Sequence, residues 1–151
     1  MDQDHITTST RHIDWISFHR DVQTLADALA PHGPFERIIA VTRGGLVPAA
    51  LLARMLDLRL VDTICISSYD DRVQRSGEPI VLKGVAGDGS GWLVVDDLAD
   101  SGNTLKTVRQ MLPKAHFATV YAKPLGAPLV DSVAVTVAQS DWLVFPWDQT
   151  Y

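Results

Sequence analysis

The sequence predicts an α/β fold in which helices flank a central, mostly parallel sheet. Short apolar runs, typical of strands that are covered on both faces, occur at residues 37–42, 60–67, 92–96 and 117–122. Helix-forming segments stand between most of these runs. Strand and helix therefore alternate along the chain, which favours parallel strands with helices on the faces of the sheet. In such sheets, ligands bind at the carboxyl ends of the strands.

Three helices are expected from apolar side chains at helical spacing. The first covers residues 15–30, with Asp14 in position to cap it, and its apolar side chains are Trp15, Phe18, Val22, Leu25 and Leu29. Pro31-His32-Gly33-Pro34 ends this helix. A second helix is expected over residues 47–56, and a third begins after Thr104.

The composition indicates a single acidic globular domain, residues 1–151. Hydrophobic residues make up 46% and charged residues 21% of the chain, as in ordinary globular proteins, and the net charge is −5. The negative balance argues against nucleic acid as a partner. No signal peptide or bilayer-length apolar run is found, so we expect a cytoplasmic protein. The single cysteine, Cys65, is expected to be a small buried hydrophobe in a reducing compartment.

The most informative segment is an apolar run that ends in two adjacent acids, Asp96 and Asp97. Asp100 then opens a loop of small and hydroxyl-bearing residues, 101–104, that leads into the third helix. Backbone N–H groups of such a loop and of the first helical turn can bind a phosphate. Carboxylates beside a phosphate repel it unless they hold a divalent cation or the hydroxyls of the ligand. The segment therefore predicts a site for a sugar phosphate with a hard metal ion.

Two further loops follow strands of the predicted sheet. Arg43-Gly44-Gly45 comes directly after the strand at 37–42, and it combines a permanently charged donor with backbone that can approach an anion closely. Residues 68–91 are polar and longer than most connections, as active-site lids often are; a plain β-hairpin arm without a function is the alternative. Residues 87–91 are expected to form a turn.

The run Val94 to Thr104 resembles the phosphoribosyl pyrophosphate signature of type I phosphoribosyltransferases, and the segment around Arg43 resembles their pyrophosphate loop. Lys123-Pro124 and residues 141–148 are similar to the purine branch, and most similar to bacterial xanthine-guanine phosphoribosyltransferases. The likeness runs from about Trp15 to Asp148. It implies the fold of that family, with a mobile loop at about 69–90 and a small C-terminal, base-binding hood at about 124–151.

The resemblance implies an enzyme of purine salvage. The N9 nitrogen of guanine, xanthine or hypoxanthine displaces pyrophosphate from phosphoribosyl pyrophosphate, with Mg²⁺ as cofactor, and a nucleoside 5′-monophosphate forms. Carried over residue by residue, the donor site comprises Arg43, Gly44, Asp96, Asp97, Leu98, Ala99, Asp100, Ser101, Gly102, Asn103 and Thr104, with Ser68, Tyr69 and Lys83 from the long loop. Ser68 and Tyr69 match the Ser-Tyr pair that closes over the transition state. Lys83-Gly84 stands where relatives often have two basic residues, so one contact to the diphosphate is lost or moved.

The resemblance assigns the remaining roles as follows. Asp100 is the general acid or base toward the purine N7. Lys123 donates to the purine O6, Trp142 stacks on the base, and a backbone carbonyl near Leu143 accepts from the 2-amino group. The metal ligands are Asp97 and, for a second Mg²⁺, Asp148.

Alternatives remain open at this point. One is a regulator with the same fold that binds a nucleotide or sugar diphosphate without significant turnover. Another is an adenine or orotate enzyme, although Lys123 as an O6 donor argues against adenine. The preference among 6-oxopurines stays open. The histidines are expected to be solvated or buried rather than zinc ligands. The resemblance also implies a homo-oligomer, tetramer or dimer, and leaves open peripheral association with the inner face of the membrane.

Overall fold

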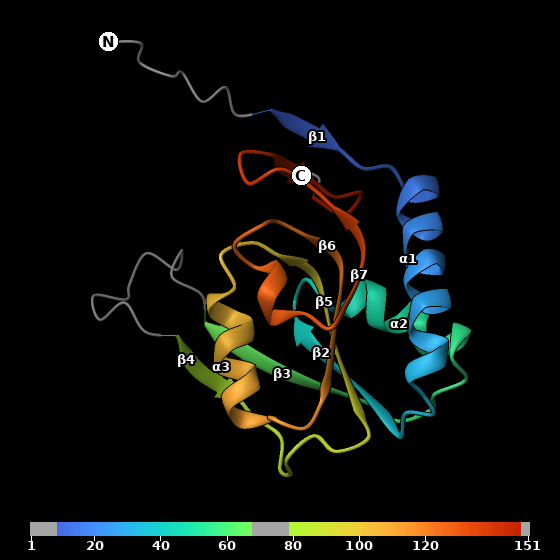
Figure 1. The fold of residues 1–151 in the computed structure, drawn as a ribbon, viewed down its shortest axis with the longest axis vertical. Coiled ribbons are helices and arrows are strands. Elements are labelled where there is room, and N and C mark those ends of the chain that lie inside the picture. Colours follow the sequence, from blue (N-terminus) through green and yellow to red (C-terminus); the bar gives the residue numbers. More distant parts are fainter. Residues whose placement is uncertain (1–8, 68–78, 149–151) are drawn as a thin grey trace.

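A computed structural model describes residues 9–67 and 79–148, and its centre is a six-stranded sheet in the order β4-β3-β2-β5-β6-β7 (Figure 1). Every pair of neighbouring strands is parallel except β3 and β4, which are antiparallel. The predicted α/β class with a mostly parallel sheet is confirmed. The strands are β2 (Arg37–Thr42), β3 (Val61–Ser67), β4 (Ile80–Lys83), β5 (Trp92–Ala99), β6 (His116–Ala122) and β7 (Ser132–Thr136).

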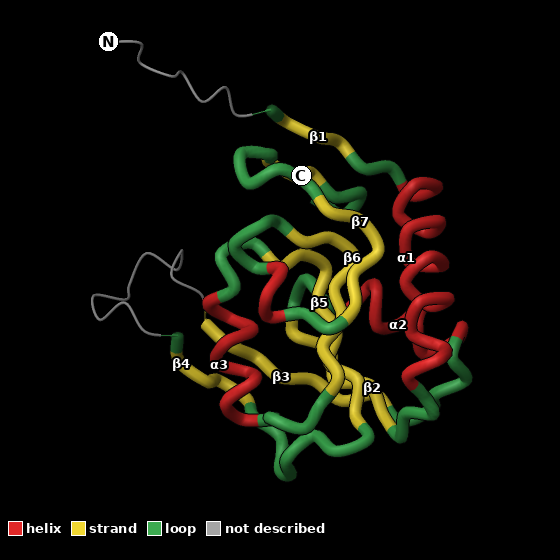
Figure 2. Tube along the Cα trace, in the orientation of Figure 1, coloured by secondary structure: helices red, strands yellow, loops and turns green. Residues whose placement is uncertain are grey.

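Helices cover both faces of this sheet (Figure 2). On one face lie α1 (Trp15–Leu29) and α2 (Leu46–Met55), and on the other lies α3 (Asn103–Met111). Each face has its own apolar core: Phe18, Leu25 and Leu52 belong to the first, and Val108 and Phe117 to the second. Burial of these side chains on two faces holds the central strands in place, and the carboxyl ends of β2, β5 and β6 meet at one edge.

The described part of the hood is a second, small sheet at this edge, and both ends of the chain contribute to it (Figure 1). Its strands are β1 (Thr10–His12) and β8 (Trp142–Val144), which pair in parallel. The hood was expected at about 124–151, and the structure differs from this in two ways. Strand β1 belongs to the hood, whereas β7 pairs with β6 and is the edge strand of the central sheet. Short 3₁₀-helices, η1 (Ala30–His32) and η2 (Ala127–Leu129), complete the described elements.

The predicted helices lie within one or two residues of their observed bounds. The Asp14 carboxylate caps α1 as expected, because its Oδ1 accepts from the backbone N–H of Ser17 at 2.7 Å. One strand differs more. β5 continues through Ala99, with Asp96 opposite Thr119 and Leu98 opposite Tyr121 on β6. The two acids therefore lie within the paired strand rather than at its tip, because the backbone ladder continues regardless of side-chain polarity.

The long loop predicted at 69–90 is shorter than expected at its far end. Strand β4 pairs with β3 as the hairpin alternative proposed, and residues 87–91 form turns. The remaining part of the expected lid, including Ser68 and Tyr69, lies outside the described residues.

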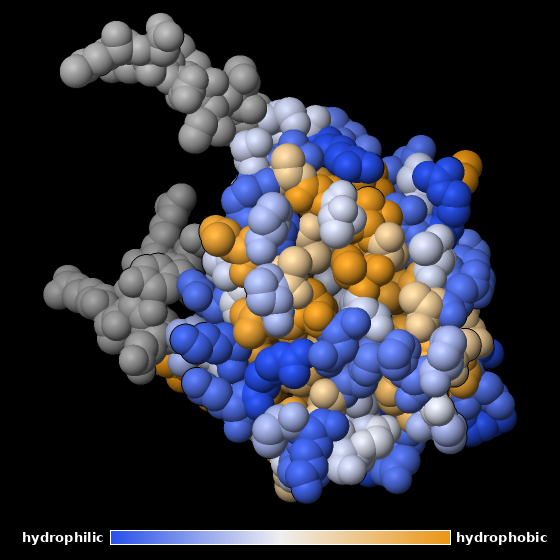
Figure 3. Space-filling model, in the orientation of Figure 1, coloured by the Kyte–Doolittle hydropathy of each residue, from blue (hydrophilic) through white to orange (hydrophobic). Residues whose placement is uncertain are grey.

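Among the residues that are described, no helix is both long and apolar enough to cross a bilayer. In the space-filling view, apolar side chains gather over η2 and β7, with hydrophilic residues around them (Figure 3).

Candidate active site

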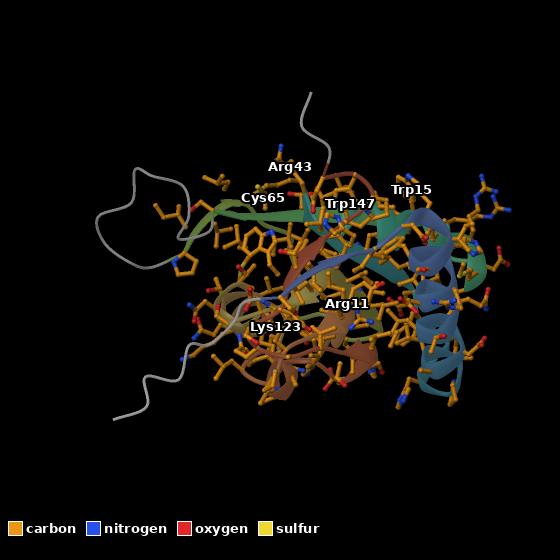
Figure 4. The ribbon with its side chains drawn as sticks, turned by 90° about the horizontal axis from the view of Figure 1, so that it is seen from above. Arg11, Trp15, Arg43, Cys65, Lys123 and Trp147 are labelled. Carbon is orange, nitrogen blue, oxygen red and sulfur yellow. The ribbon has the colours of Figure 1, made fainter. Side chains whose placement is uncertain are left out.

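The predicted site residues converge at the carboxyl edge of the central sheet. Arg43 directly follows β2, Asp96 and Asp97 lie in the last part of β5, and Lys123 directly follows β6. Seen from above, Arg43 and Cys65 lie toward one end of this edge, and Lys123 and Arg11 lie toward the other (Figure 4). A ligand bound here would contact loops from three neighbouring strands, as the topology predicts.

The loop after β2 packs its backbone against the acidic strand. A Cβ atom added to Gly44 would lie 2.6 Å from Oδ1 of Asp97, and one on Gly45 would overlap the carbonyl oxygen of Val95. Both positions therefore require glycine for close approach. The peptide bond between Thr42 and Arg43 is cis. α2 begins directly after Gly45, so its N-terminal N–H groups also face this edge, where an anion is favoured.

Asp96 and Asp97 form a half-buried acidic pair on β5. The backbone N–H of Asp97 donates to Oδ1 of Asp96 at 2.8 Å. Burial raises the pKa of Asp96 well above its usual range, and the charge of Asp97 raises it further. Burial also raises the pKa of Asp97, and the charge of Asp148 adds to this effect. Three carboxyls thus gather negative charge that a cation or hydroxyl donors of a ligand would stabilise.

The donor set suits a hard divalent cation. Carboxylate oxygens are the protein ligands that Mg²⁺ prefers, and it commonly keeps several waters and takes only one or two carboxylates. Asp97 and Asp148 fit that pattern. In residues 9–67 and 79–148, no group of three or more His, Cys, Asp or Glu side chains is placed so that it could hold a metal ion together. Two of the histidines contact each other: the ring centroids of His32 and His116 lie 4.7 Å apart, and Nε2 of His116 lies 2.8 Å from the Ser132 hydroxyl oxygen. The expectation that no histidine binds zinc stays a prediction.

The loop between β5 and α3 encloses a small cavity. Its volume is about 100 Å³, and its lining is Asp96 together with residues 98–105. Gly102 caps α3 with φ +88°, and a Cβ there would overlap Cδ1 of Leu129. The hydroxyl of Ser101 accepts from the backbone N–H of Asn103 at 3.3 Å. The loop thus lines a space of phosphate size at a helix N-terminus, where the predicted 5′-phosphate would bind.

Lys123 and Asp100 form an ion pair at the border of that cavity. Nζ of Lys123 lies 3.2 Å from Oδ2 of Asp100, and the Lys123 side chain is only 6% exposed whereas that of Asp100 is 51% exposed. The backbone N–H of Lys123 donates to the carbonyl of Ala99 at 2.9 Å, which fixes the start of the lysine against β5. A buried ammonium beside a half-exposed carboxylate offers a ligand one strong donor and one strong acceptor.

The two hood residues predicted to bind the base have different surroundings. The Trp142 side chain is 63% exposed, whereas Leu143 is buried in the core that contains α1. The Leu143 side chain is therefore not available to a ligand, and the predicted contact of its backbone carbonyl stays a prediction. A cavity of about 430 Å³ lies beside Lys123, and its lining includes Arg11, Thr136 and Asp141.

Lys83 and Cys65 have surroundings that differ from those expected. The Lys83 side chain is paired with β3: its Nζ donates to Oδ1 of Asp62 at 2.9 Å and to the carbonyl of Thr63 at 2.6 Å. Its predicted contact with the diphosphate stays a prediction. Cys65 is half-buried rather than buried, because it lies opposite Thr42 and Lys83 near the open edge of the sheet.

Gln139 contacts the site although no sequence motif indicates it. The Gln139 side chain, from the loop between β7 and β8, donates through Nε2 to Oδ1 of Asp100 at 3.0 Å. Nothing in the local pattern around Gln139 indicates this contact, since it joins residues 39 positions apart. The sheet topology is the signal that could have indicated this contact, because it brings the loop between β7 and β8 to the carboxyl edge.

Comparison with known proteins agrees with this geometry. A family model described as the phosphoribosyl transferase domain matches residues 14–151. The xanthine-guanine phosphoribosyltransferase of Desulfotalea psychrophila is 56% identical over 136 residues, which cover 90% of this chain and 84% of that protein. The enzyme of the same name from Nitratidesulfovibrio vulgaris (strain Hildenborough) is 57% identical over 136 residues, which cover 90% of this chain and 83% of that protein.

Solved structures give the same result. A purine phosphoribosyltransferase from Pyrococcus horikoshii superposes with a TM-score of 0.79 at 27% identity, covering 94% of this chain and 96% of that one. The xanthine-guanine-hypoxanthine phosphoribosyltransferase of Helicobacter pylori gives 0.71 at 25% identity, covering 92% and 93%. With the acidic strand, the anion loop and the paired lysine all in place, the chain belongs to the type I phosphoribosyltransferases, in their purine branch.

Proposed function

We propose that this protein transfers the 5-phosphoribosyl group of phosphoribosyl pyrophosphate to N9 of a 6-oxopurine, in purine salvage. The products are pyrophosphate and the nucleoside 5′-monophosphate. The observation that carries the proposal is the Lys123–Asp100 pair, 3.2 Å apart, at the border of the phosphate-sized cavity. That pair presents a donor and an acceptor where a base joined to a bound ribose phosphate must lie. The relatives named above support the choice of a purine such as guanine or xanthine.

On the purine side, we assign Lys123 to the O6 oxygen and Asp100 to N7. Trp142 stacks on the base, and the carbonyl near Leu143 accepts from a 2-amino group. As the N9–C1′ bond forms, the bond from C1′ to the pyrophosphate oxygen breaks, and pyrophosphate leaves with the electron pair. The N7 proton passes to the Asp100 carboxylate, which therefore acts as the general base.

On the donor side, the 5′-phosphate binds the backbone N–H groups and hydroxyls of residues 100–104. Asp96 and Asp97 bind the ribose hydroxyls, and Arg43 with the N–H of Gly44 binds the pyrophosphate. Ser68, Tyr69 and Lys83 complete the donor site, with Ser68 and Tyr69 excluding water during the reaction. Most of the catalysis in this scheme is positioning and electrostatic stabilisation of a ribose ring that gains positive charge.

Mg²⁺ is the proposed cofactor, held by Asp97 and, at a second position, by Asp148. When bound, it neutralises charge on the diphosphate leaving group. The raised pKa values of Asp96 and Asp97 support this assignment, since neighbouring carboxyls in a half-buried site favour a cation between or beside them. Isothermal titration of Mg²⁺ into the wild type and Asp97→Asn, with phosphoribosyl pyrophosphate present, tests it; equal affinity in both would contradict the role of Asp97.

We further propose a cytoplasmic homo-oligomer, either a dimer or a tetramer. A groove of about 610 Å³ between α2 and β3 supports self-association, because its rim exposes Leu46 and Val61. Light scattering coupled to size-exclusion chromatography measures the mass, and a monomer at micromolar concentration would contradict the proposal. Peripheral binding to the inner membrane face is the alternative location, and flotation with anionic vesicles detects it.

The deciding experiment is an assay of purified protein with phosphoribosyl pyrophosphate and Mg²⁺. Five bases are offered separately: guanine, xanthine, hypoxanthine, adenine and orotate. Conversion of one or more of the first three supports the proposal and ranks the preferred substrate. Conversion of adenine or orotate alone would contradict the substrate class, and turnover of none of the five would favour the regulator that binds a nucleotide or sugar diphosphate.

A further inference from the structure

Gln139, in the loop between β7 and β8, forms hydrogen bonds to two other loops, the one after β6 and the one after β5. Its side-chain oxygen Oε1 accepts from the backbone N–H of Leu125 at 3.0 Å. Its nitrogen Nε2 donates to Oδ1 of Asp100 at 3.0 Å. Because a backbone N–H only donates, the amide oxygen must face Leu125, so the NH₂ group must face Asp100. The orientation of the amide is therefore fixed by its partners.

The two oxygens of Asp100 are held from two different elements. Oδ2 accepts from the ammonium of Lys123, which follows β6, and Oδ1 accepts from Gln139, which lies in the loop between β7 and β8. Half of the Asp100 side chain is exposed, so without partners it would rotate freely. The pair of hydrogen bonds fixes the plane of the carboxylate relative to the phosphate loop.

The two partners of Asp100 have different roles in the proposed reaction. Under the proposed function, on which this inference rests, Lys123 must turn its ammonium to the purine O6. Asp100 then loses part of its contact with Lys123 at the time when it has to meet N7. Gln139 has no assigned contact with the substrate, so it is free to keep Asp100 in place. It is also neutral, so it stabilises the carboxylate without adding a charge that competes with Lys123.

From this geometry we infer that Gln139 is a positioning residue for the transfer step, acting through Asp100 alone. It orients the carboxylate toward N7 as Lys123 turns to the base. Removing Gln139 therefore slows turnover and leaves binding of phosphoribosyl pyrophosphate unchanged, because the donor site is formed by other groups.

The test compares Gln139→Leu and Gln139→Glu with the wild type. Gln139→Leu removes the donor at similar size. Gln139→Glu keeps an acceptor for Leu125 but places a second carboxylate beside Asp100. A hydrogen bond to a charged group is worth enough to expect a kcat lowered about ten- to a hundredfold for the leucine variant, and at least as much for the glutamate variant. The KM and the calorimetric affinity for phosphoribosyl pyrophosphate are expected to stay within about twofold of the wild type.

The matched control is Gln23→Leu. Gln23 also donates through Nε2 to an aspartate, Oδ1 of Asp27, at 3.2 Å, but on the exposed surface of α1. This variant is expected to have the wild-type kcat. It shows what loss of a Gln–Asp hydrogen bond does away from the site.

A double-mutant cycle with Asp100→Asn separates positioning from a general effect on folding. In the Asp100→Asn background, Gln139→Leu is expected to change kcat less than about twofold, because the carboxylate it acts on is gone. An equal loss in both backgrounds, or a parallel loss of donor affinity, would overturn the inference. So would a wild-type kcat in Gln139→Leu. A wild type that converts none of the purines would overturn the proposed function together with this role, whereas an active wild type with additive variants overturns this role alone.

Discussion

At the scale of single residues, the contacts of Asp100 separate catalysis from binding. Its carboxylate borders the phosphate cavity but donor binding is shared among many backbone groups of residues 100–104. Asp100→Asn is therefore expected to lower kcat about a hundred- to ten-thousandfold, as loss of a general base does, with donor affinity changed only slightly. Steady-state kinetics and calorimetry with phosphoribosyl pyrophosphate measure the two effects. A parallel fall in both quantities would reject the acid–base role.

Trp142 is the second residue whose surroundings allow a sharp prediction. With 63% of its side chain exposed, it contributes little to the core. Trp142→Ala is expected to raise the KM for the purine about ten- to a hundredfold, because stacking on a base is worth about 1–3 kcal/mol, while the donor KM stays unchanged.

Trp15→Ala is the contrasting variant. Trp15 is also largely exposed, but its ring packs on Phe18 and Trp147 at centroid distances of 6.4 and 5.9 Å. Its replacement is expected to lower stability by about 1 kcal/mol or more and to leave the purine KM unchanged. A collapse of donor affinity in Trp142→Ala would instead assign that tryptophan to the fold.

At the scale of elements, the start of α3 depends on one glycine. Gly102 has φ +88°, and a Cβ would overlap the Leu129 side chain in η2. Gly102→Ala combines backbone strain with overpacking, so we expect a loss of about 2–4 kcal/mol in the free energy of unfolding, together with weaker donor binding. Urea unfolding measures the first effect and calorimetry the second.

Gly84→Ala is the matched control for Gly102→Ala, at a glycine whose φ is not positive. Gly84 lies just after β4, and a Cβ added there would lie 3.3 Å from the flexible end of Met111 and in ordinary contact with Val81, at 3.7 Å. Its stability is expected to stay within about 0.5 kcal/mol of the wild type. Similar losses in the two variants would show that the left-handed backbone of Gly102 is not what makes it necessary.

The elements also show what a sequence can and cannot predict. Strand β2 and helix α1 are recognisable because their local patterns agree with their burial: a continuous apolar run for one, and helical spacing with an Asp cap for the other. Strands β1, β7 and β8 are short, and their pairing depends on segments far away in the chain, so no local pattern reveals them. The continuation of β5 through its acids escaped prediction for the same reason.

At the scale of the whole molecule, the site was predictable where it is contiguous in sequence. The acidic strand and its loop, residues 96–104, form one motif, and the edge that they share with Arg43 and Lys123 follows from the parallel topology. Gln139 and the ion pair between Lys83 and Asp62 are long-range contacts between side chains, and they depend on how the loops pack. The sequence pattern therefore predicts the sheet and the contiguous motif, whereas tertiary packing determines which side chains form hydrogen bonds and ion pairs with each other.

The fold also places several carboxyl groups close together at the carboxyl edge of the central sheet, which makes the stability of the protein depend on pH. The pKa of Asp96 is raised above the ordinary value of 3.8 by burial and by Asp97. As the pH rises above about 4, the unfolded chain releases this proton while the native state retains it, so the native state binds more protons and stability falls with rising pH. Asn at position 96 cannot ionise and avoids this loss.

Asp96→Asn is therefore expected to be more stable than the wild type at pH 7 in EDTA, with a difference that shrinks toward pH 4. Each kcal/mol of relief raises the Tm by about 2–4 °C in a chain of this size. Asp88→Asn should show the opposite behaviour. The N–H of Ser90 and the ammonium of Lys114 lower the pKa of Asp88, so its contribution is present at neutral pH and is lost as the pH falls through the lowered pKa. Thermal unfolding measures the two trends, from about pH 4 to 8 for Asp96→Asn and from about pH 2 to 5 for Asp88→Asn, because the pKa of Asp88 lies below its ordinary value. A Tm gain for Asp96→Asn that does not change with pH would show that its charge is not the cause.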